Sequence, residues 1–179
     1  FGGPNYPNEE AEQADFLRLL PAVDFYVYKE GERPFLHLLQ ALIAARFDVE
    51  AVKRTSPPSC HFLHDGRFVP GPLMERVRSL SEIPSPYTEG LFDKFFDGKL
   101  VPLIQTNRGC PFTCTFCVEG LGYYNKIAMA GPDRVRSELR YIAERYAGAR
   151  ILNIADSNFG MYKEDVEIAQ AIAEMQERY

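Results

Sequence analysis

The second half of the chain carries two successive strand–helix patterns, and these constrain the fold more than any other feature. Apolar runs at 100–106 and 149–156 are typical of buried strands, and helical patterns follow them at 131–148 and 163–179. Strands separated by a helix pair in parallel, so this half is predicted to be α/β, in a barrel or an open sheet. In either architecture, chemistry is expected at the carboxyl ends of the strands.

The first half also alternates strand and helix patterns. Residues 9–20 predict a short helix, and residues 21–28, rich in aromatic and β-branched side chains, predict a buried strand. A second helix is predicted from Pro34, with four apolar side chains spaced to share one face: Phe35, Leu38, Leu39 and Leu42. Residues 1–47 are therefore predicted to belong to an open α/β domain.

Residues 48–98 have fewer regular periods and are predicted to link the two domains. They contain Asp65-Gly66 between two short runs, which is typical of a hairpin with a type I′ turn. The second α/β domain is then expected over residues 99–179.

The composition is that of a soluble globular protein, with 46% hydrophobic and 25% charged residues. The formal net charge of −5 argues against nucleic acid as a partner. No apolar run approaches the length of a membrane span, and closely spaced cysteines are typical of the reducing cytoplasm. Because the chain begins at Phe1 and ends at Tyr179 within a helical pattern, we expect a piece of a larger protein, inactive by itself.

Cys110, Cys114 and Cys117 follow the first strand of the second domain, where an active site is expected. Thiolates are ligands of zinc, cuprous copper and iron–sulfur clusters. A structural zinc site needs four ligands, and the remaining cysteine, Cys60, lies far upstream. A [4Fe–4S] cluster held by three cysteines leaves one iron open to a small molecule. Asp156 ends the next strand, so its carboxylate is expected at the same edge of the sheet.

Two alternatives remain open from the residues alone. One is a zinc-stabilised interaction module without catalysis, in which Cys60 or a histidine completes the site. The other is an electron-transfer iron–sulfur protein, with Cys60 as the fourth ligand. Cys60, His61 and His64 are more simply explained as alternating side chains of the hairpin, and they are not assigned to the site.

The string RGCPFTCTFC at 108–117 resembles the first barrel loop of the radical S-adenosylmethionine superfamily. The resemblance implies that Cys110, Cys114 and Cys117 hold a [4Fe–4S] cluster and that Phe116 lies against the adenine of S-adenosylmethionine. It also implies reductive cleavage of S-adenosylmethionine to methionine and a 5′-deoxyadenosyl radical, which abstracts a substrate hydrogen. The implied partners are a small-molecule substrate and a reductant such as flavodoxin or ferredoxin.

The first half is similar to the subgroup of this superfamily with an amino-terminal cobalamin-binding domain. FGGP, KEGE at 29–32 and SLSEIPSPY carry this resemblance, which implies that Gly2 and Gly3 approach the nucleotide tail of cobalamin. The D-x-H-x-x-G motif of the axial histidine would lie before Phe1. An ordinary tight turn is the alternative for the two glycines.

DSNF at 156–159 is similar to the D-x-N-F that follows the second barrel strand of these enzymes. The resemblance implies that Asp156 and Asn158 contact S-adenosylmethionine in place of the Gly-Gly-Glu of many members. The alternatives are a turn or cap role for Asp156 and plain core packing for Phe116. The expected fold is the end of a Rossmann-like cobalamin-binding-type domain, followed by the first two strand–helix units of a truncated TIM-type barrel.

Overall fold

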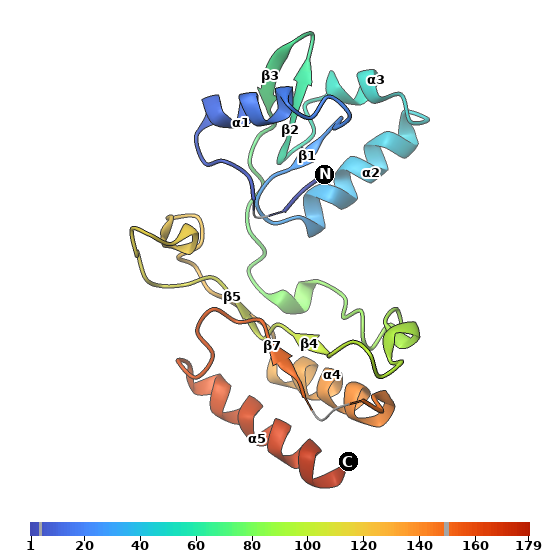
Figure 1. Cartoon of the computed structure of the whole chain (residues 1–179), viewed down its shortest axis with the longest axis vertical. Helices are drawn as coiled ribbons and strands as arrows, with labels where there is room; N and C mark the ends of the chain where they lie inside the picture. Colours follow the sequence, from blue (N-terminus) through green and yellow to red (C-terminus); the bar gives the residue numbers. More distant parts are fainter. Residues whose placement is uncertain (4, 149–150) are drawn as a thin grey trace. The chain divides into compact units, whose positions relative to one another are not determined.

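The computed structural model describes residues 1–3, 5–148 and 151–179, and it divides the chain into two compact units (Figure 1). The first unit is Phe1–Arg76 and the second is Val77–Tyr179. The predicted linker is thus divided between them at Arg76. Whether the units are a cobalamin-binding-type domain and the start of a barrel stays a prediction. Within the described ranges, no helix is both long and apolar enough to cross a membrane.

The first unit is built on a three-stranded antiparallel sheet in the order β1-β2-β3. Its strands are β1 (Tyr26–Val27), β2 (Cys60–His64) and β3 (Arg67–Pro70). The strand predicted at 21–28 is shorter than expected, because a turn follows the first helix at 21–22. Since β2 pairs with both β1 and β3, the hairpin is part of this sheet and not of a linker segment.

The turn between β2 and β3 has the predicted geometry. Asp65 and Gly66 have φ angles of 49° and 72°. A positive φ at both central residues is the requirement of a type I′ turn, whose twist matches that of the flanking strands. The hairpin predicted from Asp65-Gly66 is therefore confirmed.

Three helices cover the sheet of the first unit: α1 (Glu10–Arg18), α2 (Glu32–Ala44) and α3 (Val49–Lys53). The face predicted for α2 is partly wrong, because Phe35 and Leu39 are exposed. The buried face runs through Pro34 and Leu38, one helical turn apart. The core of this unit consists of Phe25, Val27, Leu38, Val52, Cys60 and Phe62.

His61 of β2 lies among aromatic rings. Its ring centroid is 4.4 Å from that of Tyr28 and 5.4 Å from that of Phe68. Burial, assisted by the positive charge of Lys29, lowers the pKa of His61 to about 4. The imidazole is therefore neutral at neutral pH.

Acidification is expected to destabilise the first unit through His61. In the unfolded chain, a histidine has a pKa of about 6.5, so between this pH and the folded-state pKa the unfolded chain binds a proton that the folded state does not bind. The contribution of His61 to stability is therefore complete well above pH 6.5 and is lost as the pH falls from 6.5 towards 4, with a loss of about 2.5 kcal/mol by pH 4.5. Urea denaturation across this range should show the loss in wild type and in His37→Gln, an exposed control, but not in His61→Gln. An equal loss in His61→Gln would contradict the assignment.

The second unit contains two small sheets (Figure 1). Strands β4 (Leu103–Ile104) and β7 (Asn153–Ile154) pair in parallel, as the strand–helix pattern predicted. Strands β5 (Asn107–Arg108) and β6 (Ala128–Met129) pair antiparallel. Ala149 and Arg150, where the second strand was predicted to begin, lie outside the described residues.

Two long helices pack on each other in this unit: α4 (Pro132–Arg145) and α5 (Lys163–Arg178). Pro132 occupies the first helical turn of α4, as predicted. The predicted faces are confirmed where they are buried, at Val135, Leu139, Ile142 and Ile168. These side chains share one core with Ile104 of β4, so the helices cover the parallel strand pair. Among the described residues of this unit there are also three short 3₁₀ helices: η1 (Leu80–Glu82), η2 (Asp93–Phe95) and η3 (Val118–Gly120).

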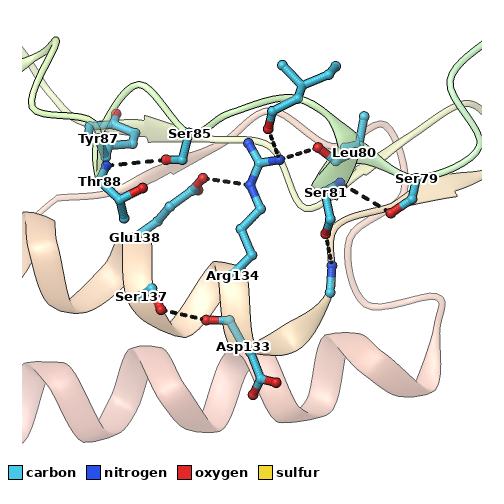
Figure 2. Close-up of polar contacts among 12 residues, drawn as sticks. Ser79, Leu80, Ser81, Ser85, Tyr87, Thr88, Asp133, Arg134, Ser137 and Glu138 are labelled. Atoms are coloured by element: carbon cyan, nitrogen blue, oxygen red, sulfur yellow. Dashed lines mark hydrogen bonds and ion pairs between the residues drawn. The ribbon is translucent and has the colours of Figure 1, made fainter.

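Arg134 of α4 binds the segment 80–83, which lies near the start of the second unit (Figure 2). Its guanidinium donates to the carbonyl oxygen of Ile83 at 2.5 Å and to that of Leu80. It also donates to Oε1 of Glu138 at 2.9 Å, and Glu138 is only 5% exposed. The chain around η1 is therefore held against α4 by the guanidinium bonds to two carbonyl oxygens, and the ion pair with Glu138 within α4 orients that guanidinium.

Arg134→Ala is expected to lower the free energy of unfolding by about 2 kcal/mol, because it leaves the buried Glu138 carboxylate without its partner. Arg136→Ala is the matched control on the same helix. Arg136 pairs with Glu174 at 3.3 Å in an exposed position, and its loss should cost less than about 0.5 kcal/mol. Chemical denaturation of the two variants measures the difference. Equal stabilities would contradict the role of Arg134.

Candidate metal centre

The antiparallel pair β5–β6 forms the base of the loop that carries the three cysteines. Asn107 pairs with Met129 and Arg108 pairs with Ala128. Just beyond this base, the backbone N–H of Cys110 donates to the carbonyl oxygen of Tyr124 at 3.0 Å. The loop 109–127 therefore leaves the sheet and returns beside its own start, with all three thiols on it.

The entry segment of the second unit also supports this base. The Ser79 hydroxyl donates to the carbonyl oxygen of Met129 in β6 at 3.1 Å. The Ser81 hydroxyl accepts from the N–H of Gly131, which caps α4, at 3.0 Å (Figure 2). The return strand of the cysteine loop is thus tied to the segment that Arg134 holds.

Two glycines let the backbone of the cysteine loop approach itself closely. Gly109 has a φ of 110°, and a Cβ there would lie 2.7 Å from the carbonyl oxygens of Tyr124 and Lys126. At Gly120 a Cβ would lie 2.2 Å from the carbonyl oxygen of Cys114. Any larger residue at either position would force the loop apart, so the glycines determine where the thiols lie.

The thiols are accessible and held by short backbone turns. Cys114 and Cys117 are exposed, and Cys110 is half-buried. The N–H of Cys117 donates to the carbonyl oxygen of Cys114 at 3.2 Å, and that of Gly120 to Cys117 at 3.0 Å. By donor type alone, three thiols on one glycine-shaped loop suit an iron–sulfur cluster. In the part of the chain that the structure describes, no three His, Cys, Asp or Glu side chains are arranged to hold a metal ion.

Cys60 does not have the properties of a fourth ligand. It is completely buried in the core of the first unit. Burial raises the pKa of its thiol to about 11, whereas a metal binds the thiolate. The neighbouring His61 is buried among aromatic rings, and His64 lies with Nδ1 3.1 Å from Oε2 of Glu50. These features disfavour the electron-transfer alternative, which relies on Cys60, and the zinc alternative with Cys60, His61 or His64 as the fourth ligand.

Asp156 joins the ends of the two parallel strands beside the cysteine loop. Its Oδ1 accepts from the backbone N–H groups of Thr106 at 2.7 Å and Asn107 at 3.2 Å. Its Oδ2 accepts from Nδ2 of Asn107 at 2.9 Å and from the Thr106 hydroxyl. The expected meeting of the two strand ends is therefore confirmed. Asp156 acts here as a brace, and its contact with S-adenosylmethionine stays a prediction.

The other two residues assigned to S-adenosylmethionine are placed differently. Phe116 is 92% exposed, so it does not belong to the core, and its ring is open to a ligand. Nδ2 of Asn158 is buried and has no hydrogen-bond partner among the described residues. Both contacts stay predictions. The exposed ring of Phe116 and the unpartnered amide of Asn158 are each available to make one.

The two glycines assigned to cobalamin lie in the first unit. Gly2 forms a single parallel bridge with Val27, and a Cβ there would lie 3.2 Å from the carbonyl oxygen of Val27. Gly3 has a φ of 136°, and its carbonyl oxygen accepts from the Tyr26 hydroxyl at 2.8 Å. A Cβ at Gly3 would meet no atom within 4 Å among the described residues, so its outer side is open to a ligand.

Two further residues of this region were not predicted from the sequence. Asn107 is 2% exposed, and its Oδ1 has no hydrogen-bond partner in the described structure. The Tyr162 hydroxyl, at the start of α5, is likewise buried without a partner. Burial and the negative charge of Cys110 raise the pKa of Tyr162. The position of Tyr162 shortly after the DSNF stretch is the only signal that could have pointed to it.

Comparisons with known proteins identify methyltransferases among the relatives, while no protein-family model matches the chain. The 2-(S-pantetheinyl)-carbapenam-3-carboxylate methyltransferase of Streptantibioticus cattleyicolor is 34% identical over 179 residues, which is 97% of this chain and 25% of the relative. The cobalamin-dependent radical SAM methyltransferase TokK of Streptomyces tokunonensis is 31% identical with the same coverage. An uncharacterized methyltransferase, PH0819 of Pyrococcus horikoshii, is 29% identical over 82% of this chain and 31% of its own length. The chain thus spans about a quarter of the first two relatives.

Proposed function

Because the chain belongs to the radical S-adenosylmethionine superfamily, in the subgroup with an amino-terminal cobalamin-binding domain, we propose that it provides the cluster loop of a methyltransferase. The proposed substrate is a small molecule, and the proposed reductant is a flavodoxin or ferredoxin. The observation that carries the proposal is the set of three thiols on one loop, two of them exposed, which begins shortly after the residues that Asp156 binds.

The residues of the second unit have separate tasks in this proposal. Cys110, Cys114 and Cys117 ligate three irons of a [4Fe–4S] cluster and leave the fourth iron to S-adenosylmethionine. When bound, the cluster would supply the electron for reductive cleavage of S-adenosylmethionine, after it has itself received that electron from the reductant. The exposed ring of Phe116 covers the adenine, and the unpartnered Nδ2 of Asn158 donates to a polar group of S-adenosylmethionine.

The first unit is proposed to contribute to cobalamin binding, and the bound cobalamin would supply a methyl carrier. Gly3 fits this role because its outer side is open and its backbone adopts a conformation that suits glycine. Gly2 lets the chain run close beside Val27 at the edge of the sheet. These two glycines would allow the nucleotide tail to approach the backbone closely.

The test is anaerobic reconstitution of the protein at its full natural length, followed by reduction in the presence of S-adenosylmethionine. We expect 5′-deoxyadenosine in the wild-type reaction, detected by mass spectrometry, and none from Cys114→Ala. A protein that holds its cluster but forms no 5′-deoxyadenosine would contradict the proposal. A colourless protein containing zinc would instead support the interaction module.

A further inference from the structure

The segment that follows Gly3 lies against a cluster of aromatic side chains in the first unit. The ring of Tyr6 stacks on that of Tyr26 in β1, with the ring centroids 3.9 Å apart and an angle of 13° between the planes. Phe16 of α1 meets both rings with its edge, at centroid distances of 5.3 Å from Tyr6 and 5.9 Å from Tyr26. Because these ring contacts bury apolar surface, they hold Tyr6 against β1.

Two hydrogen bonds add to the ring contacts of this segment. The Tyr6 hydroxyl lies 3.3 Å from Nδ1 of His61 in β2. The imidazole is neutral at neutral pH because burial lowers the pKa of His61 to about 4, so its Nδ1 can accept from the hydroxyl. On the other side, Nε2 of the buried Gln13 in α1 donates to the carbonyl oxygen of Pro7 at 2.8 Å. The segment after the two glycines is therefore held from both β2 and α1.

Tyr26 connects this cluster directly to the glycine pair. Its side chain is almost completely buried, and its hydroxyl donates to the carbonyl oxygen of Gly3 at 2.8 Å. Gly2 is fixed beside Val27 by a parallel bridge, and the N–H of Val27 donates to the carbonyl oxygen of Phe1 at 2.7 Å. The inner side of the glycine turn is thus bound to β1, whereas a Cβ on Gly3 would meet no atom within 4 Å among the described residues.

We propose that Tyr26, through its hydrogen bond to the carbonyl oxygen of Gly3, holds the glycine turn in the conformation that receives the nucleotide tail of cobalamin, and that Tyr6 keeps the Tyr26 ring in place. The proposal rests on the proposed function, to which cobalamin belongs. A backbone segment already fixed in its bound conformation loses less conformational freedom on binding, which increases affinity, and glycine has the most freedom to lose. Tyr26 acts through the backbone of Gly3, so it is a positioning residue.

The experiment measures the dissociation constant of hydroxocobalamin by equilibrium dialysis, with the protein at its full natural length. Tyr26→Phe keeps the stacked ring and removes the hydroxyl, and it should weaken binding about five-fold, the effect of one hydrogen bond. Tyr28→Phe is the matched control. The Tyr28 ring lies in the same cluster, 4.4 Å from that of His61, but its hydroxyl makes no hydrogen bond among the described residues. This variant should bind like wild type.

Replacing Tyr26 by 4-aminophenylalanine keeps the ring and a donor at the same position, so it should restore most of the lost affinity. A loss as large as that of Tyr26→Phe would indicate a structural effect and overturn the proposal, as would equal dissociation constants for Tyr26→Phe and Tyr28→Phe.

If Tyr26→Phe does not fold, Tyr6→Ala decides, because it removes the ring stacked on Tyr26. Weaker binding supports the proposal, and wild-type affinity overturns it. A wild-type protein that binds no hydroxocobalamin would overturn the cobalamin part of the proposed function and the positioning role with it, whereas the other negative outcomes overturn the positioning role alone.

Discussion

Cys114→Ala is expected to abolish the cluster and with it all cleavage of S-adenosylmethionine. Cys114 is an exposed thiol on the loop, and the one cysteine outside the loop, Cys60, is buried in the core of the first unit and cannot replace it. Anaerobic reconstitution should give about four irons per wild-type chain and less than about one in the variant. Iron and sulfide analysis, with the visible absorption of the cluster, measures the loss.

Cys60→Ala is the matched control for this substitution. The buried thiol of Cys60 lies in the core of the first unit, so the variant should keep its iron, its sulfide and its 5′-deoxyadenosine formation. Loss of the cluster in Cys60→Ala would indicate a fourth protein ligand and support electron transfer. Full iron content in Cys114→Ala would contradict the assignment of the three thiols.

Asp156→Ala is expected to cause the largest loss of stability in the second unit, about 4 kcal/mol. The substitution removes four hydrogen bonds and leaves two buried backbone donors, at Thr106 and Asn107, unsatisfied. Because Asn107 lies three residues before Cys110, the variant should also lose its cluster faster in the presence of an iron chelator. Urea denaturation and the rate of iron release measure the two effects.

Asp133→Ala, an exposed carboxylate in the first turn of α4, is the control and should cost only about 0.5 kcal/mol. The loss of stability in Asp156→Asn should lie between those of the two alanine variants, because the amide keeps one acceptor and places a donor where Asp156 accepts. If Asp156→Ala were as stable as Asp133→Ala, the brace between the strand ends would not exist as described.

Much of the fold follows from local patterns. The type I′ turn depends on Asp65 and Gly66 alone, and the parallel pairing of β4 with β7 follows from one intervening helix. The buried face of α2 was only partly predictable. Phe35 and Leu39 have the spacing of a helical face but are exposed, whereas Leu38 belongs to the core of the unit. Tertiary packing decides which neighbour a helix contacts, and the spacing of apolar residues in the sequence carries no information about that packing.

The candidate site also contains residues that the sequence predicted and residues that it did not. The sequence predicted that the cysteine loop and Asp156 would follow strands of one sheet, and Asp156 does lie where β4 and β7 end. The strand that leads directly into the cysteine loop is β5, which belongs to the separate β5–β6 pair, and the role of the three thiols as metal ligands stays a prediction. Asn107 and Tyr162 were not predicted, because neither stands in a recognisable motif. Their importance depends on buried atoms without partners, and burial arises only when the loops close over the strand ends.

Mössbauer spectroscopy of the ⁵⁷Fe-reconstituted protein, with and without S-adenosylmethionine, tests the central claim most directly. The claim is that three cysteines leave one iron open to the small molecule. About one quarter of the iron should change its isomer shift when S-adenosylmethionine is added, because one iron of four gains ligands. A spectrum of a [4Fe–4S] cluster that does not respond to S-adenosylmethionine would contradict the account.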